Sequence, residues 1–513
     1  MISRILSLEA GGKRIVILNE SDAKELGIRS SDRVRVLADG HELGAIVNTT
    51  SRLIREGELG VFLEVQQHLQ LDDGEAVEVT PAGSPPSLLH IRSKLRGRSL
   101  AVTELRDIVR DVVDGKLSDI EIASFVVGLH SFGISPEEAY GLSTAMVETG
   151  VTLKLGASMI VDKHSIGGVP GDKTTLLVVP IVSACGLTIP KTSSRAITSA
   201  AGTADRAEVL MPVKFSVDEM SRIVKRTNGC VVWGGALDLA PADDLFVQVE
   251  HPLSIDPLLL PSILSKKKAV NADVVVIDIP CGRGTKVKTI GEAEILARDF
   301  MRLGSRLGMR LQCAITFGEQ PVGHCVGAAL EAREALETIM GRSSVPDLVD
   351  KAVDLAGILL EMAGITQNGW DLAMETLKSG KAEKKLREII SEQGGDGKIT
   401  PENIPIGKES VDIISDNSGY VFWINNNSLV QLARVSGAPK DNGAGIIIHK
   451  KIGDTVKEGE KLYTIYAEKG TKLSEAERLA RDARVFGVSD RVEMMIEEIK
   501  ELREEEKAFI LER

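Results

Sequence analysis

Two stretches of the chain combine glycine, lysine and hydroxyl residues in the way that a phosphate site requires. The first runs from Val161 to Thr175 and contains Lys163, Ser165 and three glycines between two apolar segments. Glycine lets the backbone approach an anion and turn N–H groups toward it, while lysine adds charge and a hydroxyl adds a short hydrogen bond. Taken alone, this stretch fits a phosphate or ribose site and a plain glycine turn equally well.

The second stretch, from Lys191 to Glu208, favours the phosphate interpretation. It holds six hydroxyl residues and two arginines, with a tight turn at Gly202 and Thr203. A solvated linker of this composition would lack the apolar segments that flank both stretches. Because apolar secondary structure joins the two stretches, we expect both loops at one edge of the same sheet.

Composition excludes several classes of protein. The 513 residues include 62 Lys and Arg and 74 Asp and Glu, a formal net charge of −12, which argues against nucleic acid as the main partner. Aromatic residues make up 3% of the chain, too few for platforms that stack single-stranded nucleic acid. No apolar run reaches the roughly 18 residues of a membrane span and no secretory leader is evident, so we expect a cytoplasmic protein without membrane contact. The five cysteines form no CxxC pair and predict no zinc site.

The elements that must position the two loops fall into four predicted regions. Short β-branched runs predict a small β-rich module at the start, where Asp22–Val36 loosely resembles a double-psi β-barrel. Apolar residues at helical spacing from Leu105 to Val113, with cap signals at Ser118 and Ser135, predict the helices that follow. The predicted regions are a β-rich module at 1–85, a helical domain at 86–155 and 243–270, an α/β domain at 156–242 and 271–405, and a C-terminal α+β domain at 406–513.

The middle and the end of the chain predict the layers around the loops. Short apolar segments at Leu176–Val182 and Val274–Ile279 alternate with helical segments, which is typical of an α/β layer with a parallel or mixed sheet. In the tail, Ser418–Trp423 alternates as a strand, and Gly443–Gly459 has the strand–turn–strand rhythm of a barrel-sandwich unit. Such units can carry a modified lysine, but no matching hairpin lysine occurs, which favours a structural unit. The charged residues Arg491–Arg513 predict a solvated helix.

Four ordered motifs resemble the thymidine and pyrimidine-nucleoside phosphorylase family. Ser193–Glu208 follows that family's pattern of Ser, Arg, Gly-Thr, Asp and Glu, and the first loop is similar to its Lys-His-Ser-x-Gly-Gly-Val-Gly-Asp loop with Pro170 inserted. Ser262–Lys266 and Gly318–Gly323 are similar to two further motifs in the same order. The resemblance covers about residues 86–500 and implies a helical domain and an α/β domain with a cleft between them.

Four features look more like the branch of that family that acts on nucleoside 5′-monophosphates, the AMP phosphorylases. They are the extra N-terminal module, the run Ser194–Ser199 in place of a glycine-rich segment, the absence of a base-gripping arginine near Glu250–Asp256, and the basic glycine loop within Ile277–Val287. The resemblance implies that AMP and phosphate give adenine and ribose 1,5-bisphosphate. Inorganic phosphate would be the co-substrate, no metal or organic cofactor would be needed, and a homodimer or larger homo-oligomer is expected.

The same resemblance assigns roles to individual residues. Asp256 would be catalytic and donate a proton to the departing base. The attacking phosphate would be bound by Lys163, Ser165, Thr175, Ser193 and Thr203. The nucleotide would be contacted by Gly168, Ser194, Arg195, Ala196, Ile197, Thr198, Ser199, Thr203, Ser262 and Lys286. An aspartic acid with an ordinary pKa of about 3.9 is ionised at neutral pH, so a donor of this type needs burial or nearby negative charge.

Alternatives stay open for individual residues and for the function. His164 could contact substrate or orient its loop, Asp172 could pair with Lys163 or cap the next helix, and Arg195 could be structural. Within Lys266–Lys268, a solvated helix end is expected with Lys266 pointing inward. A thymidine or uridine phosphorylase is the alternative enzyme. A nucleotide-binding regulator without catalysis is the alternative outside the enzyme class.

Overall fold

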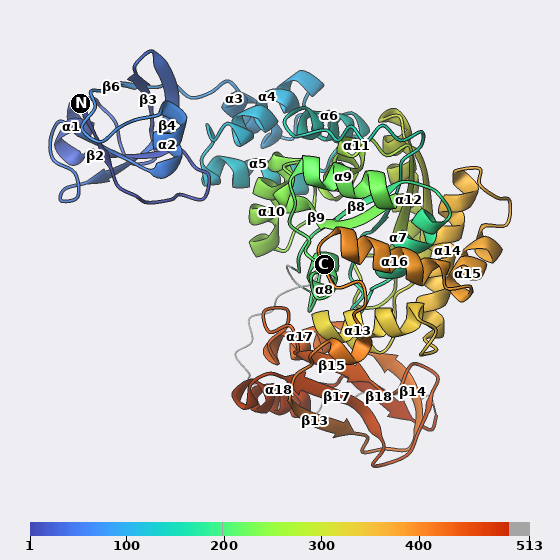
Figure 1. Cartoon of the computed structure of the whole chain (residues 1–513). Coiled ribbons are helices and arrows are strands. Elements are labelled where there is room, and N and C mark those ends of the chain that lie inside the picture. Colours follow the sequence, from blue (N-terminus) through green and yellow to red (C-terminus); the bar gives the residue numbers. More distant parts are fainter. Residues whose placement is uncertain (197–198, 492–513) are drawn as a thin grey trace.

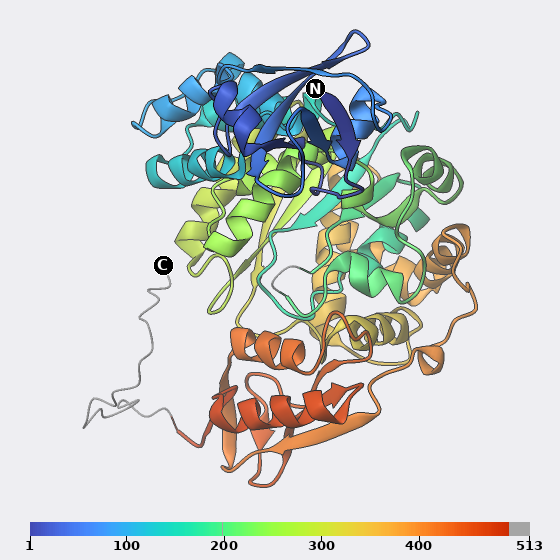
Figure 2. The same cartoon turned by 90° about the vertical axis from the view of Figure 1, so that its left-hand side faces the viewer.

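The computed structural model describes residues 1–196 and 199–491 (Figure 1), so Ile197, Thr198 and nearly all of the tail that was expected to be helical lie outside the described residues. The N-terminal module and the C-terminal domain lie at opposite ends of the molecule, and the helical and α/β layers lie between them (Figures 1 and 2). In the described part of the chain, no helix is long and apolar enough to cross a membrane.

The N-terminal module is built on a six-stranded mixed sheet with the order β1-β5-β2-β4-β3-β6. Alternating residues of these strands, such as Val34 and Val36, point into one core, as their β-branched pattern predicts. The module rests on the helical layer, because Lys13 pairs with Asp119 at 2.6 Å and Arg33 donates to the backbone oxygen of Lys116 at 2.7 Å. The elements are β1 Ile2–Ile5, β2 Ile15–Asn19, α1 Glu20–Glu25, β3 Arg33–Ala38, β4 His41–Thr50, β5 Glu58–Val61, α2 Leu63–Leu69 and β6 Glu78–Pro81.

The helical layer joins two segments that are far apart in the sequence. Ser118 and Ser135 cap their helices through capping boxes with Glu121 and Glu138, which confirms both cap predictions. The predicted apolar stripe that starts at Leu105 is buried in the core of this layer. The helices are α3 Ser87–Lys94, α4 Val102–Val113, α5 Asp119–Phe132, α6 Pro136–Glu148, α10 Pro241–Leu253 and α11 Leu259–Ala269.

The α/β layer has five parallel strands whose carboxyl ends lie at one edge. Strands β11, β10 and β7 pair in that order, and β8 pairs with β9. A parallel bridge between Ile160 and Thr188 connects β7 to β8. Both predicted loops therefore leave the sheet at the same edge, as expected for ligand sites in such sheets. The strands are β7 Val161–Ser165, β8 Ile189–Ser193, β9 Gly229–Trp233, β10 Val274–Cys281 and β11 Arg310–Phe317.

Eight helices of the described chain belong to this layer, and one of them corrects an expectation. The apolar segment Leu176–Val182 lies inside helix α7, Thr175–Ala184, and not in a strand. Its side chains are buried on every side, so the sequence lacks the polar face that would mark a helix, and a short apolar run cannot distinguish the two structures. The others are α8 Thr203–Glu208, α9 Val217–Thr227, α12 Ile290–Arg306, α13 Ala328–Ile339, α14 Pro346–Met362, α15 Gly369–Lys378 and α16 Lys381–Glu392.

Up to residue 491, where the described part ends, the C-terminal domain contains two small antiparallel sheets and two helices. The predicted strand at Ser418–Trp423 and the predicted strand–turn–strand unit are both present as β14, β15 and β16. Strand β12, which precedes α13, pairs with β15, so this domain shares a sheet with the α/β layer. The elements are β12 Cys325–Val326, β13 Glu409–Ile414, β14 Gly419–Ile424, α17 Asn426–Val435, β15 Gly445–Ile448, β16 Thr455–Val456, β17 Lys461–Ala467, α18 Gly470–Asp482 and β18 Phe486–Ser489.

Candidate active site

Lys163 is the central residue of β7, two residues before the point where the first loop leaves the sheet. Its side chain is buried, and Nζ donates a hydrogen bond to Oγ1 of Thr174 at 2.8 Å. Burial lowers the pKa of Lys163, and within the described residues no carboxylate forms an ion pair with it. A buried ammonium group with one neutral partner keeps donors free for an anion, so this position suits phosphate.

Asp172 in the same loop belongs to an ion-pair network that reaches Lys163 through the hydroxyl of Thr174. One carboxylate oxygen accepts from the backbone N–H and the hydroxyl of Thr174, at 3.2 and 2.6 Å, and the other accepts from Lys351 at 3.1 Å. Lys351 also pairs with Asp278 on β10 at 2.8 Å. Although burial opposes it, the positive charge of Lys351 holds the pKa of Asp172 well below its usual range. Asp172 does not cap α7, whose N-cap residue is Thr174, and its ion-pair partner is Lys351 and not Lys163.

A second buried network fixes the side of the loop that faces the C-terminal domain. Lys173 donates to the backbone oxygens of Val322 and Cys325, at 2.9 and 3.1 Å, and pairs with Glu334. Gly171 has φ +72°, and a Cβ atom there would lie 2.7 Å from the backbone oxygen of Cys325. The loop can pack this closely because residue 171 is a glycine.

The second loop is held in shape by its own acidic residues. Arg195 donates to Glu208 at 2.5 and 2.7 Å and to Asp205 at 3.2 Å, and its guanidinium lies 5.1 Å from the ring centroid of Trp233. Asp205 also accepts from the backbone N–H groups of Ala196 and Gly202, at 2.7 and 2.8 Å. Arg195 therefore has a structural role in this loop, which was one of its two expected roles.

A third loop, which follows β10, packs directly on the first. Gly168 has φ +92°, and a Cβ atom there would lie 2.9 Å from the backbone nitrogen of Lys286. Thr285 steadies this third loop, because its hydroxyl is within hydrogen-bond distance of the backbone oxygens of Gly282 and Val287, at 2.8 and 2.5 Å. The contact at Gly168 brings Lys286 to the edge of the sheet where the two predicted loops meet.

Asp256 and Lys286 form an ion pair between the two layers. Asp256 lies in the turn between α10 and α11 of the helical layer, and its carboxylate accepts from Lys286 Nζ at 2.5 Å. The two side chains are 39% and 44% exposed, so the burial expected for a proton donor at Asp256 is absent. Of the apolar residues that follow Asp256, Leu258 is buried in the helical core, while Pro257 is half-buried and the carboxylate stays at the surface.

The turn that carries Asp256 is anchored by a buried carboxylate that the sequence did not single out. Oε1 of Glu250 in α10 accepts a hydrogen bond from the backbone N–H of Leu258 at 3.1 Å. Burial, with a further contribution from Asp256 and Asp243, raises the pKa of Glu250 to about 7. No local pattern marks such a residue, because its partner lies beyond the end of its own helix.

Other predicted site residues lie on the same edge or face it. The hydroxyl of Ser193 donates to the backbone oxygen of Val232 at 3.3 Å, and that of Ser199 donates to Ala201 at 3.3 Å. Ser165 accepts from Gly167 N–H at 3.4 Å. Thr203 is the first residue of α8, Thr175 is the first residue of α7 and Ser262 lies in α11, while Ile197 and Thr198 are outside the described residues.

The run Lys266–Lys268 at the end of α11 was expected to be solvated, and the structure corrects this expectation. Lys267 is the buried lysine of the Lys266–Lys268 run and pairs with Asp162 at 2.7 Å, while Lys266 is 33% exposed in side chain and pairs with Asp243 at 2.5 Å. Solvation of the whole run was therefore wrong, because Lys267 is buried where it pairs with Asp162 of β7. Burial and the nearby Lys267 hold the pKa of His164 well below its usual range, and in the described part of the chain His164 has no hydrogen-bond partner that would orient its loop.

The C-terminal domain reaches the same loops. Ala200 of the second loop is buried in the core of that domain. Lys451 in the turn after β15 donates to the backbone oxygen of Gly323 at 2.7 Å and pairs with Asp347 at 2.9 Å. This lysine is half-buried in a contact between domains, which agrees with a structural barrel-sandwich unit.

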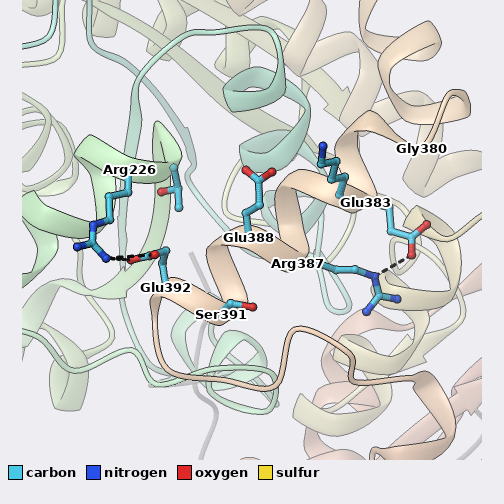
Figure 3. Close-up of a pocket in the computed structure, with 9 residues that line it drawn as sticks. Arg226, Gly380, Glu383, Arg387, Glu388, Ser391 and Glu392 are labelled. Atoms are coloured by element: carbon cyan, nitrogen blue, oxygen red, sulfur yellow. Dashed lines mark hydrogen bonds and ion pairs between the residues drawn. The ribbon is translucent and has the colours of Figure 1, made fainter.

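A pocket of about 650 Å³ lies away from these loops, between the end of α9 and α16 (Figure 3). Arg226 pairs with Glu392 at 3.1 Å and Arg387 pairs with Glu383 at 2.8 Å, so these charges of the pocket already have partners. It contains none of the predicted site residues. In the described part of the chain, no group of three or more histidine, cysteine or acidic residues could hold a metal ion.

A helical layer that faces the loop edge of a parallel sheet, with lysines and hydroxyls in the loops, defines a class of glycosyl transferases. Residues 90–150 match the glycosyl transferase family, helical bundle domain, and residues 157–383 match its a/b domain. Residues 420–486 match the pyrimidine nucleoside phosphorylase C-terminal domain. Anthranilate phosphoribosyltransferase from Thermus thermophilus has a similar fold, with a TM-score of 0.51 and 20% identity over 59% of this chain and 98% of that one.

Full-length relatives are more similar. The AMP phosphorylase of Thermofilum pendens is 51% identical over 94% of both chains. The AMP phosphorylase of Pyrococcus furiosus is 48% identical over 97% of this chain and 99% of its own, and that of Methanococcoides burtonii is 47% identical over 96% and 97%. The chain belongs to the AMP phosphorylase family.

Proposed function

We propose that the protein catalyses the phosphorolysis of AMP, in which AMP and phosphate give adenine and ribose 1,5-bisphosphate. The observation that carries this proposal is the match to AMP phosphorylases over nearly the whole chain, the N-terminal module included. The reaction breaks the bond between C1′ and N9 and forms a bond between C1′ and a phosphate oxygen. The enzyme has to position the reactants and stabilise charge, and we propose that it needs no metal or organic cofactor.

On the phosphate side, we assign Lys163 as the main charge that meets the attacking anion. The hydrogen bond from its Nζ to Thr174 fixes its direction, and no carboxylate among the described residues forms a direct ion pair with it. Hydroxyl groups at this edge of the sheet would supply the remaining donors. They are those of Ser165, Thr175, Ser193 and Thr203.

On the nucleotide side, we assign Asp256 as the proton donor to the departing adenine and Lys286 as a ligand of the 5′-phosphate. Purines leave more readily when the imidazole ring is protonated, and general acid catalysis of this kind contributes about 100-fold or more. Gly168 lets the first and third loops meet beside Lys286. We assign Ser194–Ser199, Thr203 and Ser262 to the remaining contacts with the nucleotide.

The test is a phosphate-dependent base-release assay with AMP, CMP, UMP and thymidine in parallel. Adenine release from AMP that requires phosphate, without turnover of thymidine, is the expected result. Thymidine turnover without AMP turnover would replace the proposal by a nucleoside phosphorylase, which the relatives do not favour. Binding of AMP without any base release would leave only the regulator.

We also propose a homodimer that forms through the helical layer, in a cytoplasmic protein. Large apolar side chains on α3 and α5, and just after α3, are exposed, and exposed apolar surface of this kind is typical of an interface. They are Leu89, Leu95, Ile120, Val127 and Phe132. Sedimentation equilibrium should give a dimer or a multiple of it, and Ile120→Glu should shift the protein toward monomer. A monomeric wild-type protein would contradict the proposal.

A further inference from the structure

The ion pair between Asp256 and Lys286 occupies both of the groups that we assign to the nucleotide. Within the described residues, neither side chain has another hydrogen-bond or ion-pair partner. A carboxylate that accepts a hydrogen bond from an ammonium group carries no proton of its own to donate. The same contact removes one donor of Lys286 from the reach of a phosphate.

The pair is specified by backbone that is fixed on both sides. Lys286 follows Thr285, whose hydroxyl contacts two backbone oxygens of its loop, and its own backbone nitrogen packs against Gly168. Across the gap, Glu250 holds the turn of Asp256 through the N–H of Leu258. Only the two exposed side chains are free to move, so a ligand can separate them without unfolding either loop.

We infer that the 5′-phosphate of the substrate displaces Asp256 from Lys286, so that only a nucleotide with this phosphate frees the acid that protonates the base. The inference rests on the proposed function and deepens it, because it makes Lys286 a determinant of specificity for 5′-monophosphates. A phosphate dianion offers Lys286 more charge than one carboxylate and more acceptor oxygens. The exchange therefore replaces one ion pair by a stronger one.

Acidic side chains gather on the helical side of Asp256. Burial raises the pKa of Glu250 to about 7, and the negative charges of Asp256 and Asp243 add to the rise. Lys266 pairs with Asp243, so Lys286 is the cation that compensates Asp256. Once a dianion binds Lys286, three carboxyl groups face less positive charge, and like charges at close range hold a proton.

The proton balance of the reaction is then complete. The bond from C1′ to N9 breaks, an oxygen of HPO₄²⁻ bonds to C1′, and Asp256 gives its proton to N7 of the leaving adenine. The proton that the attacking phosphate loses returns to the carboxylate of Asp256. Adenine leaves neutral, and the pentose carries both phosphates.

The experiment compares AMP, adenosine, and adenosine with added phosphite dianion, all at saturating inorganic phosphate. Phosphite supplies the dianion of the missing 5′ group as a separate molecule. The variants are Lys286→Met, which keeps the length of the side chain without its charge, and Lys286→Arg, which keeps the charge. Lys288→Met is the matched control, because Lys288 is an exposed lysine two residues further along the same loop.

For wild-type protein, we expect kcat/KM for AMP to exceed that for adenosine by about 1,000-fold or more, and phosphite to raise adenosine turnover about tenfold. Lys286→Met should lower kcat/KM for AMP by about 100-fold. The same variant should raise adenosine turnover without phosphite several-fold, because Asp256 has no ion pair with residue 286 in that variant. It should also abolish the effect of phosphite. Lys286→Arg should restore the selectivity for AMP, and Lys288→Met should behave as wild type.

Two results would overturn the inference while leaving the proposed function intact. One is a Lys286→Met variant that loses AMP and adenosine turnover by the same factor, since Lys286 would then support the loop alone. The other is wild-type adenosine turnover that phosphite leaves unchanged. If wild-type protein releases no adenine from AMP at all, the proposed function itself fails, so the two failures are distinguishable.

Discussion

The two sides of the candidate site are built in opposite ways. The phosphate side, which we define as Lys163, Asp172, Lys351 and Asp278, is mostly buried, and its ion pairs and hydrogen bonds join β7, β10 and α14 to the first loop. The nucleotide side, which we define as Asp256, Lys286 and Ser262, is more exposed and divided between two layers of the protein. Its one ion pair links those layers directly.

This difference separates groups that are fixed before substrate binds from groups that are brought together when it binds. Charges that are fixed before substrate arrives stabilise a transition state without further reorganisation, and the phosphate side meets that requirement. Groups on two separate layers come into register when the layers close on a ligand, and the nucleotide side has that character. The buried side should therefore respond to substitution through both stability and rate, and the exposed side through rate and selectivity.

The largest effect should come from removing the buried ammonium group of Lys163. Lys163→Met should lower kcat/KM for phosphate by about 1,000-fold, because one preorganised charge at the reacting anion is worth about 4 kcal/mol. Burial already lowers the pKa of this lysine, so its loss should leave the melting temperature within a few degrees of wild type. Steady-state kinetics with phosphate varied, alongside Lys154→Met as the exposed control, measures this. An unchanged kcat/KM would contradict the assignment.

Loss of Lys351 should lower the stability of the folded protein at the phosphate side. Lys351→Met leaves Asp172 and Asp278 buried without their cation, and breaking a buried ion pair in this way costs about 3 kcal/mol or more. Thermal unfolding of the variant measures the cost, with Lys378→Met as the exposed control. Adding Asp278→Asn to Lys351→Met removes one of the two stranded charges and should recover part of the lost stability. A melting temperature equal to that of wild type would show that the network is not needed.

Sequence patterns anticipated the parts of this molecule that depend on neighbouring residues. The caps at Ser118 and Ser135 and the alternating strands follow from spacing alone, and the shared edge of the two loops follows from parallel topology. The helix at Leu176–Val182 was mistaken for a strand because burial on all sides erases the periodicity that separates the two. The assignments of substrate contacts stay predictions.

Local sequence patterns did not predict ion pairs between residues that lie far apart in the chain. Asp172 and Lys351 are 179 residues apart, and no motif marks Lys351 as a residue of the loop. In the same way, a run of three lysines gave no sign that Lys267 is buried beside Asp162 while Lys266 keeps part of its exposure. Long-range charge pairing is set by the packing of whole layers, which local spacing does not encode.

Substitution of Asp256 should affect the rate and spare binding. Asp256→Asn should lower kcat with AMP by about 100-fold, or about 2.7 kcal/mol, because the amide cannot protonate the base. Its loss also releases Lys286, so AMP should bind as tightly as to wild type or more tightly. Calorimetric titration with AMP in the absence of phosphate measures the binding, and single-turnover base release measures the rate. Weakened AMP binding with an unchanged rate would remove Asp256 from its assigned role.

The smallest effect should come from Glu250, the buried carboxylate of an otherwise exposed side. Its pKa is raised from 4.5 to about 7 in the folded protein, so the folded state binds this proton more tightly than the unfolded state. Its contribution to stability is therefore highest below about pH 4.5 and falls as the pH rises toward 7, by about 2 kcal/mol between pH 5 and pH 7. Glu250→Gln keeps an acceptor for the N–H of Leu258 and cannot ionise. Its free energy of unfolding relative to that of wild type should therefore rise by about 2 kcal/mol from pH 5 to pH 7. Unfolding by denaturant at both pH values measures this, with the exposed Glu294→Gln as control. An equal difference at the two pH values would mean that Glu250 is ionised at both, and the turn of Asp256 would then rest on a charged anchor like those of the phosphate side.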